Sequence, residues 1–186
     1  MIASEQQDNR PWISTLGCDG HSYKFYLDTF EGLNIHVIAR GLALESRYAN
    51  HTTQPLTVLQ HTLACVREAE EQGLRKDIIR TMLFHDASEA YLRDLPGPVR
   101  KLCPGYTELI GRLDRRIAEK YDCIYPFPEE VHSIDKKMYR WERSTVAASE
   151  HVDVNEHVPG HSKRYLIQNA HAEQFLDVYQ SYKPNN

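Results

Sequence analysis

The stretch LFHDASEAYLRDLPGPVRK, residues 83–101, decides how this chain folds and what it can bind. It continues the apolar run IIRTMLF of residues 78–84, which is typical of a helix packed into a core. In a continuing helix, Glu89 lies one turn beyond His85 and Asp86 on the same face. Carboxylates near a core are costly unless paired with a cation, and imidazole and carboxylate are good ligands for borderline divalent metals. The stretch therefore predicts a helix that carries a metal site.

Helical patterns fill the chain from residue 34 onward, so the sequence predicts an all-α bundle. The expected helices are one from Ile35 behind an Asn34 cap, one from Pro55 to Gly73, one at residues 78–91 behind an Asp77 cap, one around residues 109–121, one from near Pro128 that carries Asp135, and one at residues 171–182.

A short N-terminal hairpin is expected before the bundle. Residues 12–16 and 22–27 form two extended segments joined by Asp19-Gly20, a good hairpin turn. The predicted organisation is a single domain with an N-terminal extension at residues 1–33, a helical core at 34–148, a long loop at 149–170 and a C-terminal helix at 171–182.

Composition limits the class of protein. The 186 residues suit one globular domain, and 41% hydrophobic and 26% charged residues are ordinary for such a domain. A formal charge of −4 without a basic block argues against nucleic acid as a partner. The four cysteines form no C-x-x-C pair, which argues against disulfides and a thiolate zinc site. No signal peptide and no apolar stretch of about 18 residues occurs, so we expect a cytoplasmic protein without a membrane partner.

Two further metal-ligand candidates lie on flanking helices. His61 projects from the helix before, and Asp135 falls four residues after Val131 on the fifth helix. A lone buried histidine is more often a satisfied core residue. Asp135 could instead be an acid on the helix surface beside lysines, and His132, one turn earlier, is a rival candidate for the metal ligand.

The order His61, His85-Asp86, Asp135 resembles the HD-domain phosphohydrolases, an all-helical superfamily whose metal ligands come in this order. HDASEAYLRDLPGPVRK is similar to the segment HDASE…DLPxPVK of bacterial 5′-deoxynucleotidases and related phage HD hydrolases, some of which are deoxyadenosine triphosphohydrolases.

The segments before His61 extend this resemblance. IHVIARGL at residues 35–42, RYANHT at 47–52 and VLQH at 58–61 are similar to a pattern of the phage members, although Asn50 stands where glycine is usual. The likeness runs from about Ile35 to Glu142, which is most of the expected helical core.

The resemblance implies one divalent metal ion, Mn, Co, Zn, Ni or Fe, held without sulfur. Carried over position by position, the metal ligands are His61, His85, Asp86 and Asp135, the catalytic acids are Glu89 and Asp94, and the substrate-binding residues are Arg47, Tyr48 and Arg100. The implied activity is cleavage of the 5′-oxygen–phosphate bond of a deoxynucleotide, either a monophosphate or a triphosphate such as dATP. Relatives of this kind also form homo-oligomers.

Several of these residues also have an alternative, purely structural interpretation. Glu89 could pair with Arg93 on the helix surface, and Asp94 could merely mark a turn. Cys65 is interpreted as a small core residue. The late histidines have spacings that match no ligand template and are interpreted as part of a solvated loop: His151, His157, His161 and His171. The alternative functions are hydrolysis of a cyclic nucleotide or alarmone, and a non-catalytic module that senses nucleotides.

Overall fold

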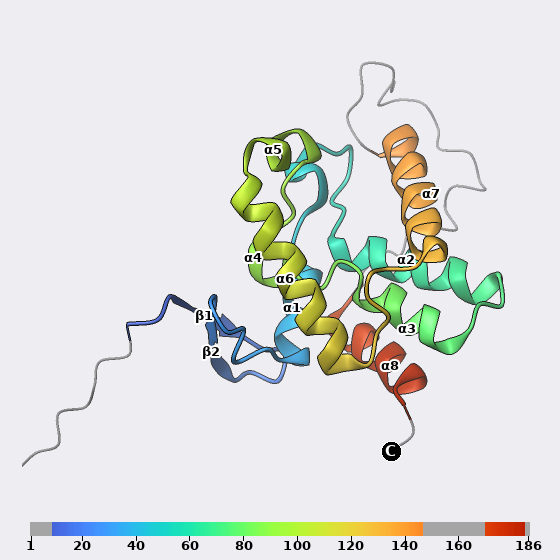
Figure 1. The fold of residues 1–186 in the computed structure, drawn as a ribbon. Coiled ribbons are helices and arrows are strands. Elements are labelled where there is room, and N and C mark those ends of the chain that lie inside the picture. Colours follow the sequence, from blue (N-terminus) through green and yellow to red (C-terminus); the bar gives the residue numbers. More distant parts are fainter. Residues whose placement is uncertain (1–8, 147–169, 185–186) are drawn as a thin grey trace, which may run out of the picture.

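The chain folds into helices behind a short N-terminal β-hairpin, as Figure 1 shows. The computed structural model describes residues 9–146 and 170–184. The elements are β1 (Trp12–Leu16), β2 (Ser22–Tyr26), α1 (Ile35–Leu44), the 3₁₀ helix η1 (Arg47–Asn50), α2 (Val58–Glu71), α3 (Lys76–Phe84), α4 (Glu89–Leu92), α5 (Gly97–Leu102), α6 (Pro104–Tyr121), α7 (Glu129–Thr145) and α8 (Ala172–Tyr182). The predicted all-α class with an N-terminal hairpin is confirmed, while the expected loop at 149–170 lies outside the described residues apart from residue 170.

An aromatic contact helps to anchor the hairpin to the helices. β1 and β2 pair antiparallel, with Trp12 opposite Tyr26. Phe25 of β2 is fully buried and stacks on Tyr91 of α4, with ring centroids 4.0 Å apart. The Tyr91 hydroxyl in turn accepts a hydrogen bond of 2.9 Å from the backbone N–H of Asn34, at the start of α1.

Helix α1 begins as predicted and comes very close to α4. The Asn34 side chain accepts a 2.8 Å hydrogen bond from the backbone N–H of His36, which is a normal N-cap. Gly41, in the middle of α1, faces Ala90: a Cβ added at Gly41 would lie 2.6 Å from the Ala90 Cβ and 2.8 Å from its Cα. The missing side chain at Gly41 therefore allows this approach.

The predicted continuous helix at residues 78–91 is wrong. Helix α3 starts after Arg75, two residues before the predicted Asp77 cap, and it ends at Phe84. Residues 85–88 then form a tighter turn, in which the N–H of Ala87 bonds to the carbonyl of Phe84 and the N–H of Glu89 to that of Asp86, both at 3.0 Å. Such three-residue hydrogen bonds are frequent at helix ends. The HD pair thus lies in a turn between α3 and α4.

Two other boundaries also differ from the prediction. Helix α2 starts at Val58 and not at Pro55, because Thr57 and Gln60 form a capping box that fixes the first turn. The sequence predicted no helix at residues 97–102, but Pro96-Gly97-Pro98 begins the short helix α5, where a proline fits the first turn. Two other predicted boundaries agree with the structure. Gly73, which has a positive φ of 66°, follows the end of α2, and Pro128 directly precedes the start of α7.

An aromatic cluster supports the end of α3 from behind. Phe84, directly before His85, is 1% exposed and stacks on Tyr121 of α6 at 4.6 Å between ring centroids. Its edges meet Phe175 and Tyr179 of α8 at 5.3 and 5.6 Å. Helix α8, red in Figure 1, packs on both α1 and α3 and so closes this side of the core. Among the described helices, none combines the length and apolar character that a membrane crossing requires.

Candidate metal centre

Three separate parts of the fold bring four ionisable side chains together. His61 comes from α2, His85 and Asp86 from the turn after α3, and Asp135 from α7. The His61 Nε2 lies 3.1 Å from Asp135 Oδ1 and 3.7 Å from Asp86 Oδ2. The His85 Nε2 lies 3.3 Å from Asp86 Oδ2 and 4.0 Å from Asp135 Oδ1. The four residues predicted as ligands therefore converge, whereas the ring of the rival His132 lies beside Phe127, with ring centroids 6.4 Å apart.

The hydrogen bonds behind the two imidazoles favour metal binding in front. The His85 Nδ1 bonds to the backbone carbonyl of Met82 at 2.7 Å, and the His61 Nδ1 bonds to a carboxylate oxygen of Glu142 at 2.6 Å. Each Nδ1 then carries a hydrogen, and each Nε2, which faces the carboxylates, can present a lone pair to a cation once it has lost its own proton. The Nε2 of His85 is buried and has no hydrogen-bond partner in the described structure. The donor set fits a borderline divalent cation.

The two carboxylates of this centre are held in the ionised form. Burial alone would raise the pKa of Asp86, but His85, His61 and Arg47 hold that pKa far below its usual range. Asp135 behaves in the same way: burial opposes ionisation, and the hydrogen bond from His61 outweighs it and lowers the pKa. Both carboxylates are therefore ionised at neutral pH and available as ligands.

Cys65 lies closer to this centre than a small core residue needs to. It is fully buried, as expected, and its Sγ lies 3.5 Å from the His61 Nε2. The ligand atoms of His61, Cys65 and His85 all lie within 4.8 Å of one another, so this buried group could also hold a metal ion. Burial raises the pKa of the Cys65 thiol, which disfavours the thiolate that binds metals. The prediction of a centre without sulfur stays a prediction.

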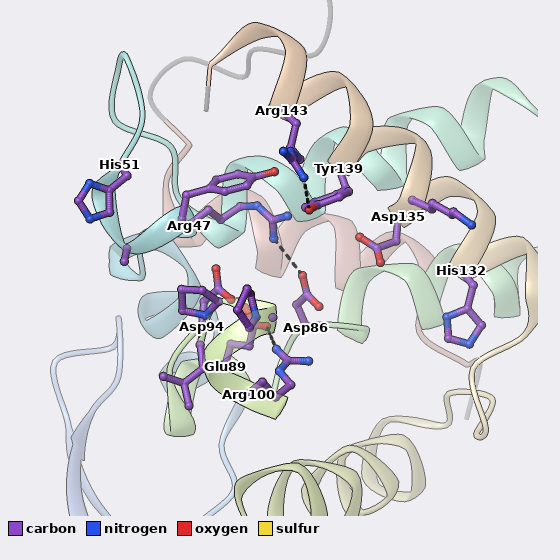
Figure 2. A pocket seen from close by; sticks show the side chains of 17 residues that line it. Arg47, His51, Asp86, Glu89, Asp94, Arg100, His132, Asp135, Tyr139 and Arg143 are labelled. Atoms are coloured by element: carbon purple, nitrogen blue, oxygen red, sulfur yellow. Dashed lines mark hydrogen bonds and ion pairs between the residues drawn. The ribbon is translucent and has the colours of Figure 1, made fainter. Parts of the chain in front are cut away.

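A pocket of about 810 Å³ opens at this centre, and Asp86 and Asp135 line it (Figure 2). All five residues that the sequence assigned to catalysis or substrate binding line it: Glu89, Asp94, Arg47, Tyr48 and Arg100. Other lining residues were not assigned to the pocket from the sequence, and most of these are basic or aromatic: His51, His132, Lys136, Tyr139 and Arg143. The pocket thus combines a candidate cation site with several cationic side chains, as expected for an anionic ligand.

Glu89 faces the pocket and does not make the surface pair that its spacing suggested. Its Oε1 lies 3.4 Å from an Nη2 of Arg100, while Arg93 pairs with Glu45. Glu89 is 6% exposed, and burial together with the charges of Asp86 and Asp94 raises its pKa well above the usual value. A buried carboxyl with a raised pKa is suited to proton transfer.

The loop that carries Asp94 is fixed by the same Glu45. The backbone N–H of Asp94 donates to Glu45 Oε1 at 3.1 Å. Asp94 lines the pocket, and its pKa is raised mainly by burial. Asp94 is therefore more than a turn residue in this fold, since its carboxyl shares a cavity with Glu89.

Arg47 and Tyr48 are held by a residue that the sequence reading missed. Glu142 of α7 accepts hydrogen bonds from Arg47 Nε and the Tyr48 hydroxyl, both at 3.0 Å, and its Oε2 lies 2.9 Å from Arg47 Nη2. Burial alone would raise the pKa of Glu142, but His61 and Arg47 keep it below the usual value. The signal available was spacing, because Glu142 follows Asp135 by seven residues and so lies on the same helix face.

The backbone before α2 adopts an uncommon conformation that directs these side chains. Tyr48, Ala49 and Asn50 have positive φ values of 55°, 50° and 65°. Asparagine tolerates this left-handed region better than most residues, and glycine adopts it most easily. Asn50 is therefore a residue type that suits its position in this turn.

Asp114 of α6 is a second residue that the sequence did not indicate. It borders a smaller cavity of about 280 Å³ on the other side of the turn, together with His85, Ser88 and Glu89. Burial raises the pKa of Asp114 to about 6, although Ser88 donates a hydrogen bond that opposes the rise. One of its carboxylate oxygens has no partner in the described structure.

Comparison with known proteins gives one distant relative. No family model matches the sequence. The chain is 33% identical over 99 residues to YfdR of Escherichia coli strain K12, which is described as an uncharacterized protein. The alignment covers 52% of this chain and 53% of YfdR, so the chain spans about half the length of the curated relative that it matches.

Proposed function

We propose that this protein is a metal-dependent phosphohydrolase of the HD-domain type that acts on 2′-deoxynucleotides. The observation that carries the proposal is the convergence of His61, His85, Asp86 and Asp135 beside a cavity that also carries cationic side chains. Two imidazoles and two carboxylates leave coordination positions open on a five- or six-coordinate ion, which is a requirement of catalytic metal sites. A bound ion would polarise a phosphoryl oxygen and lower the pKa of an attacking water.

Glu89 is the residue best placed to move a proton. It follows the ligands His85 and Asp86 closely in the chain, lies buried in the pocket wall and has a raised pKa. Cleavage of the 5′-oxygen–phosphate bond leaves an alkoxide that needs a proton, and a protonated carboxyl can supply it. Asp94 borders the same cavity, and its carboxylate raises the pKa of Glu89.

Arg47 is positioned to bind the reacting phosphate. Its Nε edge is occupied by Glu142, while its Nη1 lies 3.6 Å from Asp86 Oδ2 at the metal centre (Figure 2). The end of the guanidinium formed by Nη1 and Nη2 is therefore the part that can meet a phosphate, in the two-oxygen grip that arginine favours. Arg100, beside Glu89, adds a second positive charge.

The outer wall of the pocket supports a phosphate chain as substrate. Lys136 and Arg143 of α7 line the cavity beyond Asp135, with Tyr139 between them. A monophosphate needs only the ion and the cations next to it, whereas a triphosphate places charge further out. These two side chains favour the triphosphate, which would give a deoxynucleoside and triphosphate as products.

The test is a substrate panel on the purified protein with each candidate metal. Deoxynucleoside mono- and triphosphates, a cyclic nucleotide and an alarmone are incubated, and phosphate, triphosphate and nucleoside are measured. We expect release from deoxynucleotides only, with loss of turnover in Asp135→Ala and near-normal turnover in the control Lys137→Ala, on the same helix. Turnover of the cyclic nucleotide or alarmone alone would contradict the proposal, and nucleotide binding without any turnover would support the sensing module.

A further inference from the structure

Glu142 holds three residues of the site at once. Its Oε1 is bonded to the Nδ1 of His61 at 2.6 Å, and its Oε2 receives Arg47 Nε and the Tyr48 hydroxyl at 3.0 Å. Arg47 Nη2 lies 2.9 Å from the same Oε2. Glu142 is 2% exposed, so one buried carboxylate joins residues that lie more than 80 positions away in the chain.

The two oxygens of this carboxylate serve different sides of the site. Oε1 faces His61, whose other nitrogen points to Asp135 and Asp86. Oε2 faces Arg47, which lines the pocket and whose Nη1 lies 3.6 Å from Asp86 Oδ2. The orientation of the imidazole in a metal-binding histidine depends on the group that bonds to its second nitrogen. A guanidinium that is held along one edge can offer only its other edge to an anion.

We propose that Glu142 is a positioning residue for both halves of the site, orienting His61 toward the metal ion and Arg47 toward the substrate phosphate. This inference rests on the proposed function, because it assigns His61 to the metal and Arg47 to the phosphate. Glu142 does not face the cavity, since the pocket wall is formed by Arg47 and Tyr48 in front of it. Its removal should weaken binding of the metal and of the anion together.

Both binding reactions can be measured without turnover. The variant Glu142→Gln keeps the size of the side chain but removes the charge and replaces one acceptor oxygen with a donor. We expect its affinity for Co²⁺ or Mn²⁺, measured by chelator competition, to fall roughly 10- to 100-fold. The metal-saturated variant should bind inorganic phosphate about tenfold more weakly in calorimetry, the scale of one lost hydrogen bond to a charged group.

Two controls separate positioning from a general loss of structure. Glu68→Gln removes another buried glutamate, which pairs with Lys137 at 2.7 Å and lies one turn beyond Cys65 on α2, and both affinities should stay at the wild-type level. Arg47→Ala should lower the affinity for phosphate and leave metal binding within about threefold, because this arginine is not a ligand. Glu142→Gln is then distinguished by losing both.

Several outcomes would overturn the inference. A folded Glu142→Gln with wild-type affinity for either metal or phosphate refutes the dual role. Where Glu142→Gln does not fold, Glu142→Asp takes its place. A carboxylate shorter by one methylene cannot span His61 and Arg47, so the same two losses are expected, and an unchanged affinity for either metal or phosphate refutes the proposal. The substrate panel is independent of these measurements. Inactivity toward every nucleotide with both losses in Glu142→Gln would remove the proposed function and leave the positioning role in place.

Discussion

Replacing Gly41 by alanine should push apart the two helices whose contact brings Glu89 to the pocket. An alanine Cβ at this position would lie 2.6 Å from the Cβ, 2.8 Å from the Cα and 2.9 Å from the carbonyl oxygen of Ala90. Carbon atoms prefer a separation of about 3.5–4.0 Å, so α1 and α4 must separate by roughly 1 Å. Backbone atoms of Ala90 form this contact, which prevents relief by rotation of a side chain.

The energetic result combines two opposing effects. Alanine favours a helix interior over glycine by about 1 kcal/mol, and overpacking of a tight contact costs about 1–3 kcal/mol. The matched control is Gly111→Ala in α6, where the added Cβ would meet only the Tyr125 hydroxyl at 3.8 Å. Gly111→Ala should therefore stabilise the protein, and Gly41→Ala should be less stable than this control by about 1–3 kcal/mol.

Urea unfolding of both variants measures the difference, and kinetics measures its effect on the site. A shift of about 1 Å in the segment that carries Glu89 should lower kcat by up to about 100-fold. Gly111→Ala should keep the wild-type kcat. If Gly41→Ala were as stable as Gly111→Ala and equally active, the close α1–α4 approach would be refuted.

Three further predictions concern the site. Glu89→Gln should bind metal and nucleotide but lose about 10²- to 10⁴-fold in kcat, the scale of a positioned acid or base; loss of metal would instead make Glu89 a ligand. Burial raises the pKa of Asp114 from 3.8 to about 6, so the folded protein binds a proton that the unfolded chain has released, and this residue lowers stability as the pH rises through that range. In metal-free protein, Asp114→Asn should gain up to about 3 kcal/mol at pH 8 and much less at pH 4 by urea unfolding. An equal gain at both pH values would contradict the raised pKa. Saturating metal should raise the wild-type Tm and leave that of His61→Ala nearly unchanged, which calorimetry can check.

Much of the candidate site could be predicted because its residues follow patterns of local spacing in the sequence. His85 and Asp86 follow an apolar helix, and Asp135 lies four residues after Val131 on the same side of α7. The order of these residues along the chain carries the resemblance. The caps were predictable only in part. Asn34 caps α1 as expected, but the capping box of Thr57 and Gln60 moved the start of α2 past Pro55.

The features that the sequence did not indicate depend on contacts between distant parts of the chain. Glu142 stands in the charged run RWER, where a glutamate normally faces solvent, and only the approach of His61 and Arg47 makes it a buried partner. The turn at residues 85–88 contains no glycine or proline that would mark a break in the helix, so its three-residue hydrogen bonds could not be predicted from the apolar periodicity. Its shape follows from the packing of α3 and α4 against their neighbours.

Because aromatic residues of α8 pack against Phe84, the order of synthesis affects when this protein can bind a metal ion tightly. Every proposed ligand has been made once the ribosome has passed Asp135, but Phe175 and Tyr179, which pack against Phe84 beside the HD pair, come roughly forty residues later. At about 5–20 residues per second this interval lasts some seconds. During that time a nascent chain carries the complete set of metal-binding groups without the packing that fixes the HD turn, so tight metal capture should follow the docking of α8.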